Sequence, residues 1–206
     1  MARLNDFRTK IGYGIRPNLF NVSLNNAPAG VPVGLTDLTK VGFLCRSAGI
    51  PASNIGTVEV PFRGRVIKLP GDRTFESWTI TIFADPGMEI RTYLEAWMNA
   101  MNSHTGGAGV TAASDYTATL KVDLLGRGNA SQTPTLDPPH NIIKSYNFVN
   151  AFPTNISQID LSYDNNNSIA EYTVEFQYDY WLDAAGSGGT AGTTIATPNN
   201  GNIISQ

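Results

Sequence analysis

The chain has 206 residues, of which 41% are hydrophobic and 15% are charged, and its formal net charge is −3. A chain of this length buries about 70% of the surface that its unfolded form exposes, so it can fold as one β-rich domain without a metal or a disulfide. Its single cysteine, Cys45, excludes an internal disulfide and a cysteine-rich zinc site, and the acidic balance does not favour a nucleic-acid-binding protein.

Charged residues at Arg3, Asp6, Arg8 and Lys10 interrupt the start of the chain, so no secretory signal peptide is expected. No run of eighteen apolar residues occurs, which argues against a membrane span. We therefore expect a protein that is synthesised in a cytoplasm, works in solution and contacts no membrane.

Charge is distributed unevenly along the chain. Residues 1–73 contain ten basic and four acidic side chains, whereas residues 74–206 contain four basic and thirteen acidic ones. If folding keeps the two halves on different surfaces, opposed faces favour head-to-tail association of copies over two-fold pairing. If folding interleaves the halves, the asymmetry disappears, and the sequence leaves both outcomes open.

The first part of the chain predicts an arm followed by two strands. Residues 1–14 are polar with few apolar anchors, which indicates an N-terminal arm that is disordered or lies on a neighbouring molecule. Residues 15–24 alternate like a strand, and residues 40–47 resemble a more buried one. In that second strand we expect Cys45 to be a buried, inert thiol.

Residues 57–69 carry the pattern of a protruding β-hairpin. Two alternating runs flank Arg63 and Gly64, which suit a tight turn, and Pro70 and Gly71 suit another turn directly afterwards. Pro61 indicates an edge strand, and exposed edges are templates for pairing with another chain; the ordinary alternative is a solvated hairpin. The candidate subunit or ring contacts lie around the tip: Pro61, Phe62, Arg63, Gly64, Arg65 and Lys68.

Residues 74–102 predict a buried strand, a turn and one amphipathic helix. Alternation from 75 to 83 directs Trp78, Ile80 and Ile82 toward a core. Asp85 can cap the helix and Pro86 suits its first position, which places the helix over residues 86–102. Its apolar residues recur at spacings of three and four, which favours a helix face that packs on the core over one that lines a ligand pocket. These residues are Ile90, Tyr93, Leu94, Trp97, Met98 and Met101.

The second half of the chain predicts four more strands and a polar tail. The strands cover residues 116–125, 142–152, 156–163 and 169–182, and the last two are expected to form a hairpin. In the last strand five large side chains share one face: Tyr172, Val174, Phe176, Tyr178 and Tyr180. The loops 103–115 and 126–141 and the tail 183–206 hold few apolar residues. The predicted fold class is mainly β (α+β): an antiparallel β-sandwich or barrel of about eight strands with one flanking α-helix, in a single domain over residues 1–182.

No catalytic constellation stands out. His104 and His140 lie in loops and share no metal-ligand spacing. Glu171, Glu175 and Asp179 recur on one face of the last predicted strand, at twice the spacing of alternate residues, so a catalytic pair would need a partner from another strand. We expect a solvated or channel-lining acidic face and no enzyme, cofactor or metal.

One region resembles a known family. The runs from Ile11 to Phe20, from Ile50 to Gly56 and above all from Phe62 to Thr79, with the sequence FRGRVIKLPGDRTFESWT, are similar to the major tail tube proteins of contractile-tailed bacteriophages. The similarity continues through the turn at Asp85 and Pro86 into the helix, and covers the C-terminal hairpin more loosely.

This resemblance implies that six copies form a hexameric ring, that rings stack head to tail, and that strands of neighbouring subunits join into one inner β-barrel. It implies a virion location, a surrounding sheath protein, contacts with tape-measure, baseplate and terminator proteins, and passage of DNA without specific binding. A channel for DNA should hold few phosphate-binding cations. Glu171, Glu175 and Asp179 are then candidate lumen-lining residues, although they could equally face the sheath.

Other functions stay open at this point. A paralogous tube initiator or terminator, or the tube protein of an injection system, would share the fold. A carbohydrate-binding β-sandwich would be monomeric and would melt at a higher temperature with its sugar. A hydrolase would need carboxylates that the pattern does not pair.

Overall fold

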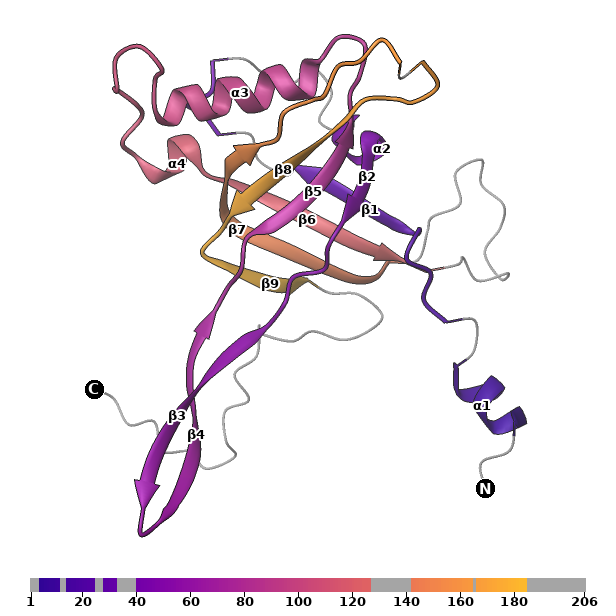
Figure 1. Ribbon diagram of the computed structural model, residues 1–206, viewed down its shortest axis with the longest axis vertical. Helices are drawn as coiled ribbons and strands as arrows, with labels where there is room; N and C mark the ends of the chain where they lie inside the picture. Colours follow the sequence, from indigo (N-terminus) through magenta and orange to yellow (C-terminus); the bar gives the residue numbers. More distant parts are fainter. Residues whose placement is uncertain are drawn as a thin grey trace.

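The structure is a computed structural model that describes residues 4–11, 14–24, 28–32, 40–126, 142–164 and 166–184. A β-sheet body is covered at one end by helix α3, and a long hairpin projects from the other end (Figure 1). In chain order the elements are α1 (Leu4–Ile11), β1 (Phe20–Leu24), α2 (Lys40–Leu44), β2 (Cys45–Ala48), β3 (Asn54–Phe62), β4 (Arg65–Thr74), β5 (Trp78–Phe83), α3 (Glu89–Met101), α4 (Ala113–Tyr116), β6 (Ala118–Leu125), β7 (Ile142–Ile156), β8 (Glu171–Gln177) and β9 (Tyr180–Ala184). The mainly β, antiparallel fold class is therefore confirmed.

Seven strands form one antiparallel sheet in the order β1-β6-β7-β8-β5-β2, and β9 pairs with β7 beside that path. The 15-residue strand β7 turns the sheet, because its first part pairs with β6 and β9 whereas residues 152–156 pair with β8. At the switch, Asn150 has a φ of 55°, a left-handed conformation that asparagine tolerates better than most residues. The two halves of the sheet thus enclose a common core.

The core is filled from β5, β8 and α3, as their periodicities predict. Trp78, Ile80 and Ile82 of β5 are buried, and the ring of Trp78 stacks on Phe148 with a centroid distance of 4.4 Å. Tyr172, Val174, Phe176 and Tyr178 are also buried. Tyr180 is 42% exposed, so its predicted place on that face is wrong: β8 ends at Gln177, and β9 starts a new alternation.

Helix α3 lies across the end of the body and buries the predicted stripe. Its side chains Ile90, Tyr93, Leu94 and Trp97 are buried, and the Trp97 indole N–H donates a 2.6 Å hydrogen bond to the Tyr116 carbonyl. The helix begins at Glu89, so the prediction of Pro86 as its first residue is wrong; Pro86 lies in the preceding turn.

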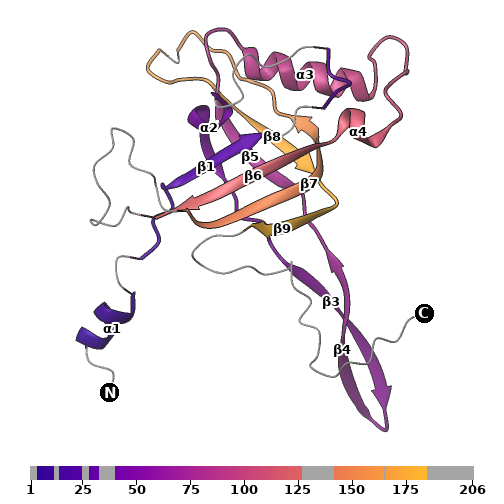
Figure 2. The same cartoon turned by 180° about the vertical axis from the view of Figure 1, so that it is seen from behind.

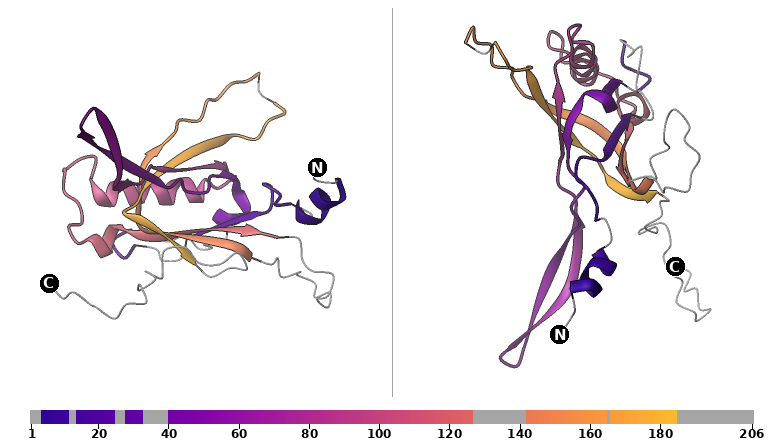
Figure 3. Two further views of the ribbon diagram at one scale, coloured as in Figure 1. Left: turned by 90° about the horizontal axis from the view of Figure 1, so that it is seen from below. Right: turned by 90° about the vertical axis from the view of Figure 1, so that its right-hand side faces the viewer.

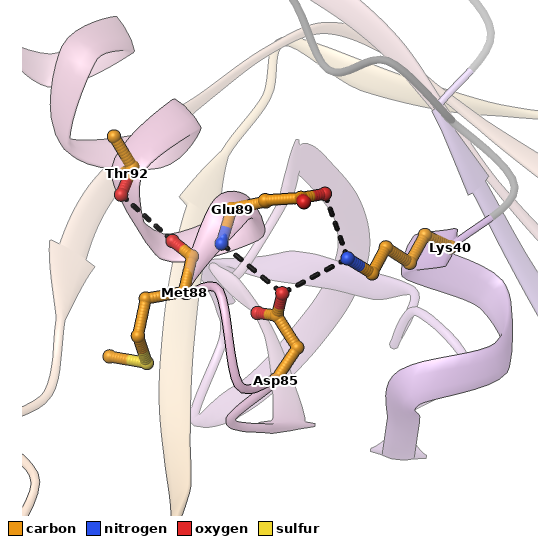
Figure 4. Close-up of polar contacts among 5 residues, drawn as sticks. All are labelled: Lys40, Asp85, Met88, Glu89 and Thr92. Carbon is orange, nitrogen blue, oxygen red and sulfur yellow. Dashed lines mark hydrogen bonds and ion pairs between the residues drawn. The ribbon is translucent and has the colours of Figure 1, made fainter.

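The N-cap residue of α3 is Met88 and not Asp85, but the Asp85 carboxylate accepts from a free backbone N–H of the first turn, as predicted, and also connects α3 to α2 (Figure 4). Its carboxylate accepts hydrogen bonds from the Glu89 backbone N–H at 3.3 Å and from Lys40 Nζ at 3.0 Å, while Lys40 also contacts Glu89 Oε2 at 2.7 Å. Burial alone would raise the pKa of Asp85, but the bonds from Lys40 and from the Glu89 backbone lower it. The bonds to Glu89 and Asp85 raise the pKa of Lys40.

The strand predicted over residues 40–47 is wrong in its first half, which is the helix α2 followed by β2. Lys40 at the start of α2 is held by Asp85 and Glu89, which lie more than forty residues away in sequence. Gly42 packs against β1, where an added Cβ would lie 2.6 Å from Asn21 Oδ1 and 2.7 Å from the Val22 carbonyl. These contacts between distant segments outweigh the apolar pattern.

Two further local predictions are wrong. Pro70 and Gly71 lie inside β4 and form no turn. Proline lacks a backbone N–H and is tolerated here because, among the described residues, β4 has no strand neighbour other than β3. Residues 157–163 are irregular, because β7 already ends at Ile156. The hairpin partner of β8 is therefore the end of β7.

Both ends of the chain differ from expectation. Asp183 and Ala184, which were predicted to begin the C-terminal tail 183–206, belong to β9, and Asp183 is buried in an ion pair with Lys144. Part of the predicted arm is the helix α1, whose apolar side chains Leu4, Phe7 and Ile11 are exposed and which stands apart from the sheet body (Figure 2). His140, most of the loop 126–141 and the tail beyond residue 184 lie outside the described residues.

Candidate assembly interface

The strands β3 and β4 form a free-standing antiparallel hairpin. In the part of the chain that the structure describes, they pair only with each other, from Asn54 opposite Thr74 to Phe62 opposite Arg65. Strand β3 has nine residues and β4 has ten, which corresponds to a length of about 30 Å. The hairpin is longer than the predicted 57–69 because residues 54–56 and 70–74 continue it beyond a bulge between Ile55 and Thr57.

The turn at the hairpin tip is the one that its dipeptide predicts. Arg63 and Gly64 have φ values of 46° and 81°, and two positive φ values in a two-residue loop characterise a type I′ turn. The Arg63 guanidinium lies 5.3 Å from the centre of the Phe62 ring. The tip therefore presents an aromatic ring together with Arg63 and Arg65.

The two faces of the hairpin differ in chemistry. Cross-strand pairing places Val58 opposite Leu69 and Val60 opposite Ile67 on one face, since opposed residues share a face. The other face carries Pro61 opposite the exposed Val66, and the ion pair between Lys68 and Glu59, with a distance of 3.6 Å. Along β3 and β4 every residue is exposed except Gly71. An apolar row of this length facing water is typical of an interaction site.

Two tryptophans hold the base of the hairpin on the body. The Trp78 indole N–H of β5 donates to the Gly49 carbonyl at 2.7 Å, and the Trp181 indole N–H of β9 donates to the Ala52 carbonyl at 3.3 Å. Both acceptors lie in the link between β2 and β3. These bonds set the direction in which the hairpin leaves the body.

One half of the body sheet has two open edges. We call the segments β7 (residues 152–156), β8, β5 and β2 the β2–β7 half-sheet. Within the described residues, β2 has one strand neighbour, β5, and residues 152–156 have one, β8. Unpaired backbone groups at such edges are available to another chain.

The predicted acidic residues lie on or beside the outward face of the β2–β7 half-sheet. Glu171 is exposed and forms an ion pair with Arg46 of β2. Glu175 is opposite Thr79 of β5 in the register. Asp179 lies beyond β8, where it accepts a 2.6 Å hydrogen bond from Asn150 Nδ2. The structure thus brings Glu171 and Glu175 onto one face and places Asp179 at its corner.

The described residues contain no group of three or more His, Cys, Asp and Glu side chains arranged to hold a metal. His104 is in an exposed turn. Burial raises the pKa of the Cys45 thiol to about 11, so the thiol stays protonated at neutral pH. Among the helices of the described segments, none has the length and apolar character needed to cross a bilayer.

The open edges of the sheet and the exposed apolar face of the hairpin are the features of one class of protein, the subunit of an assembly. The family model described as phage tail tube protein matches residues 5–184. The chain therefore belongs to the phage tail tube protein family, as its resemblance implied.

Individual relatives agree with this assignment. The tail tube protein gp19 of Enterobacteria phage T4 is 28% identical over 166 residues, which cover 81% of this chain and 90% of that protein. The tail tube protein of Serratia phage KSP90 is 24% identical over 181 residues, covering 86% and 95%.

The fold is also similar to solved structures. A chain of the sheath/tube terminator of an extracellular contractile injection system, PVC, aligns with a TM-score of 0.56 and 19% identity, covering 85% of this chain and 99% of that one. A chain of the PVC sheath-tube complex aligns with a TM-score of 0.52 and 19% identity, covering 90% and 99%. At these identities the similarity concerns the fold.

Proposed function

We propose that this chain is a structural subunit of a phage tail tube, in which hexameric rings stack into a hollow conduit for DNA inside a contractile sheath. The observation that carries the proposal is the open-edged β2–β7 half-sheet in a member of the phage tail tube family. Pairing of strands between copies would remove both edges.

In this proposal the ring closes through unlike edges. Strand β2 of one copy pairs with residues 152–156 of the next copy. Because two different edges meet, the contact is heterologous, and every edge is paired only when the copies close into a ring. Six half-sheets then form one barrel, whose inner wall is the face that bears Glu171 and Glu175, with Asp179 at the corner. An acidic wall repels phosphates, so DNA slides through without binding.

The same proposal assigns the remaining surfaces. The outside of the tube contacts the sheath protein, its ends contact baseplate and terminator proteins, and its channel holds the tape-measure protein before DNA passes. The hairpin tip, with Pro61, Phe62, Arg63, Gly64, Arg65 and Lys68, contacts neighbouring copies. The subunit is made in the host cytoplasm and ends in the virion.

Charge reversal at the tip tests the hairpin's role. Arg63→Glu with Arg65→Glu should abolish tubes seen by negative-stain microscopy and leave the melting temperature unchanged, because both side chains are exposed. Arg63→Lys with Arg65→Lys keeps the charges and is the matched control. Unaltered tube length in the reversed variant would remove this role from the hairpin.

The unmodified protein tests the function itself. It should form rings and stacked tubes at high concentration, whereas a strictly monomeric protein would contradict the proposal. Rings that never stack would indicate a tube-end protein, a role in which a subunit caps or nucleates the tube.

A further inference from the structure

A second exposed segment lies at the opposite end of the molecule from the hairpin. Between β7 and β8, residues 157–164 and 166–170 project beside α3, while β3 and β4 project from the far end of the longest axis (Figures 1 and 3). The stem of this β7–β8 loop is held to the body, because Ser157 N donates to the Thr173 carbonyl and Ala84 N donates to the Ala170 carbonyl, each at 2.8 Å.

The middle of the β7–β8 loop exposes large apolar side chains. Leu161, Tyr163 and Ile169 are 89%, 105% and 70% exposed. Local hydrogen bonds shape the loop without covering them: Gln158 Nε2 donates to Asp160 Oδ1 and Asp164 N donates to Ser162 Oγ, both at 3.2 Å. Apolar side chains that nothing in their own molecule covers are typical of a contact surface.

Charge distinguishes the two ends. Residues 157–170 contain two acidic side chains, Asp160 and Asp164, and no lysine or arginine. Residues 54–74 contain four basic and two acidic side chains. Ion pairs of Lys40 and Arg46 with acidic residues of the second half of the sequence show that folding partly interleaves the two halves. The hairpin and the loop nevertheless carry opposite net charges at opposite ends of the molecule.

We infer that the β7–β8 loop of one copy is the docking surface for the β3–β4 hairpin of the next copy along the tube. This inference rests on the proposed tube function and names the partner of the hairpin within it. Asp160 and Asp164 receive the guanidinium groups of Arg63 and Arg65. Leu161, Tyr163 and Ile169 cover the apolar face formed by Val58, Val60, Ile67 and Leu69.

The placement of the two surfaces explains why the contact propagates. Because the two surfaces lie at opposite ends of the molecule, the loop of a copy cannot cover its own hairpin. Docking therefore leaves the hairpins free at one end of the stack and the loops free at the other end. A contact between unlike surfaces that does not close produces an open filament. The charges set orientation and register, while the apolar side chains supply the buried area.

Charge exchange tests this pairing. The loop-reversed variant carries Asp160→Arg and Asp164→Arg, and the hairpin-reversed variant carries Arg63→Glu and Arg65→Glu. Each alone should lower the pelleted tube fraction by about ten-fold or more, because like charges then meet at every junction. Mixing the two purified variants should restore tubes, since each reversed surface finds its complement on the other variant. The variant with all four changes should assemble alone.

The control for nonspecific charge effects is Asp160→Asn with Asp164→Asn, which removes the attraction without repulsion and should assemble better than the loop-reversed variant. Thermal melts of every variant should match the unmodified protein.

If the unmodified protein forms tubes and the loop-reversed variant forms them at unchanged length, the docking surface is elsewhere and the tube function stands. Loss in both variants without recovery on mixing would also overturn this pairing. Absence of tubes from the unmodified protein would instead remove the proposed function.

Discussion

The β5–β8 pair and the β3–β4 hairpin are both antiparallel pairs with an apolar face, yet only the first buries that face within its own chain. Ile80 in β5 is 2% exposed, whereas Ile67 in β4 is 49% exposed. Strand β5 lies between β8 and β2, and its inward side chains share the core with α3. Within the described segments, strands β3 and β4 have no strand neighbour but each other. The same alternation thus serves folding in one place and leaves a surface for assembly in the other.

The difference is also energetic. An isolated two-stranded hairpin is only marginally stable in water, so the β3–β4 hairpin depends on its type I′ turn, its cross-strand pairs and its anchored base. The body gains its stability from buried aromatic and aliphatic side chains. Substitutions in the body should therefore change the free energy of unfolding, whereas the same substitutions in the hairpin should change assembly.

The largest contrast is expected for a matched pair of isoleucine truncations. Ile80→Ala should lower the free energy of unfolding by about 2–5 kcal/mol, because it leaves a cavity in the core. Ile67→Ala should change it by less than about 0.5 kcal/mol but should reduce tube formation. Urea denaturation and sedimentation measure the two effects. Equal loss of stability in both variants would mean that the hairpin packs on its own body.

A smaller but pH-dependent contrast is expected for two lysines. Lys40→Met leaves the buried Asp85 carboxylate without its cation, so the melting temperature at neutral pH should fall by several degrees. Lys68→Met removes only the exposed pair with Glu59, which should matter little.

The sign of the pH effect follows from Asp85. Its pKa is lowered in the folded protein, so its ion pair stabilises the fold above the ordinary carboxyl pKa of about 3.9 and loses that effect as pH falls through the folded value. The difference in melting temperature between the unmodified protein and Lys40→Met should therefore shrink toward acidic pH. A difference that is constant down to about pH 3 would contradict the role of Asp85 ionisation.

The smallest effect on the monomer is expected at the hairpin turn. Gly64→Val places a β-branched residue at a φ of 81°, which costs about 1–2 kcal/mol locally. Because no other described strand pairs with the hairpin, the global melting temperature should stay constant while hydrogen exchange of the hairpin amides accelerates. Gly64→Asn is the matched control, since asparagine tolerates this conformation. Unchanged exchange in the valine variant would show that the turn does not hold the hairpin.

Local periodicity was sufficient to predict the strands and the helix that bury one face against the core. The alternation around Ile80, the stripe of α3 and the dipeptide at Arg63 and Gly64 each encode their structure within a few residues. The helix α2 could not be predicted in this way, because it depends on Asp85, distant in sequence, and on the close approach of Gly42 to β1.

The candidate interface was predictable only in part. The exposed hairpin tip follows from Pro61 and its turn, but the open edges of the β2–β7 half-sheet depend on strand order, which the sequence does not display. The β7–β8 loop was missed because Ile159, Leu161 and Tyr163 alternate like a strand. The polar run from Asp164 to Ser168 was the sequence signal that this segment is a loop.

The two indole bonds at the hairpin base have a mechanical consequence. Trp78 and Trp181 each donate a hydrogen bond to the link between β2 and β3, and the ring of Trp78 also stacks on Phe148 in the core. The orientation of the hairpin is thereby coupled to the packing of the core.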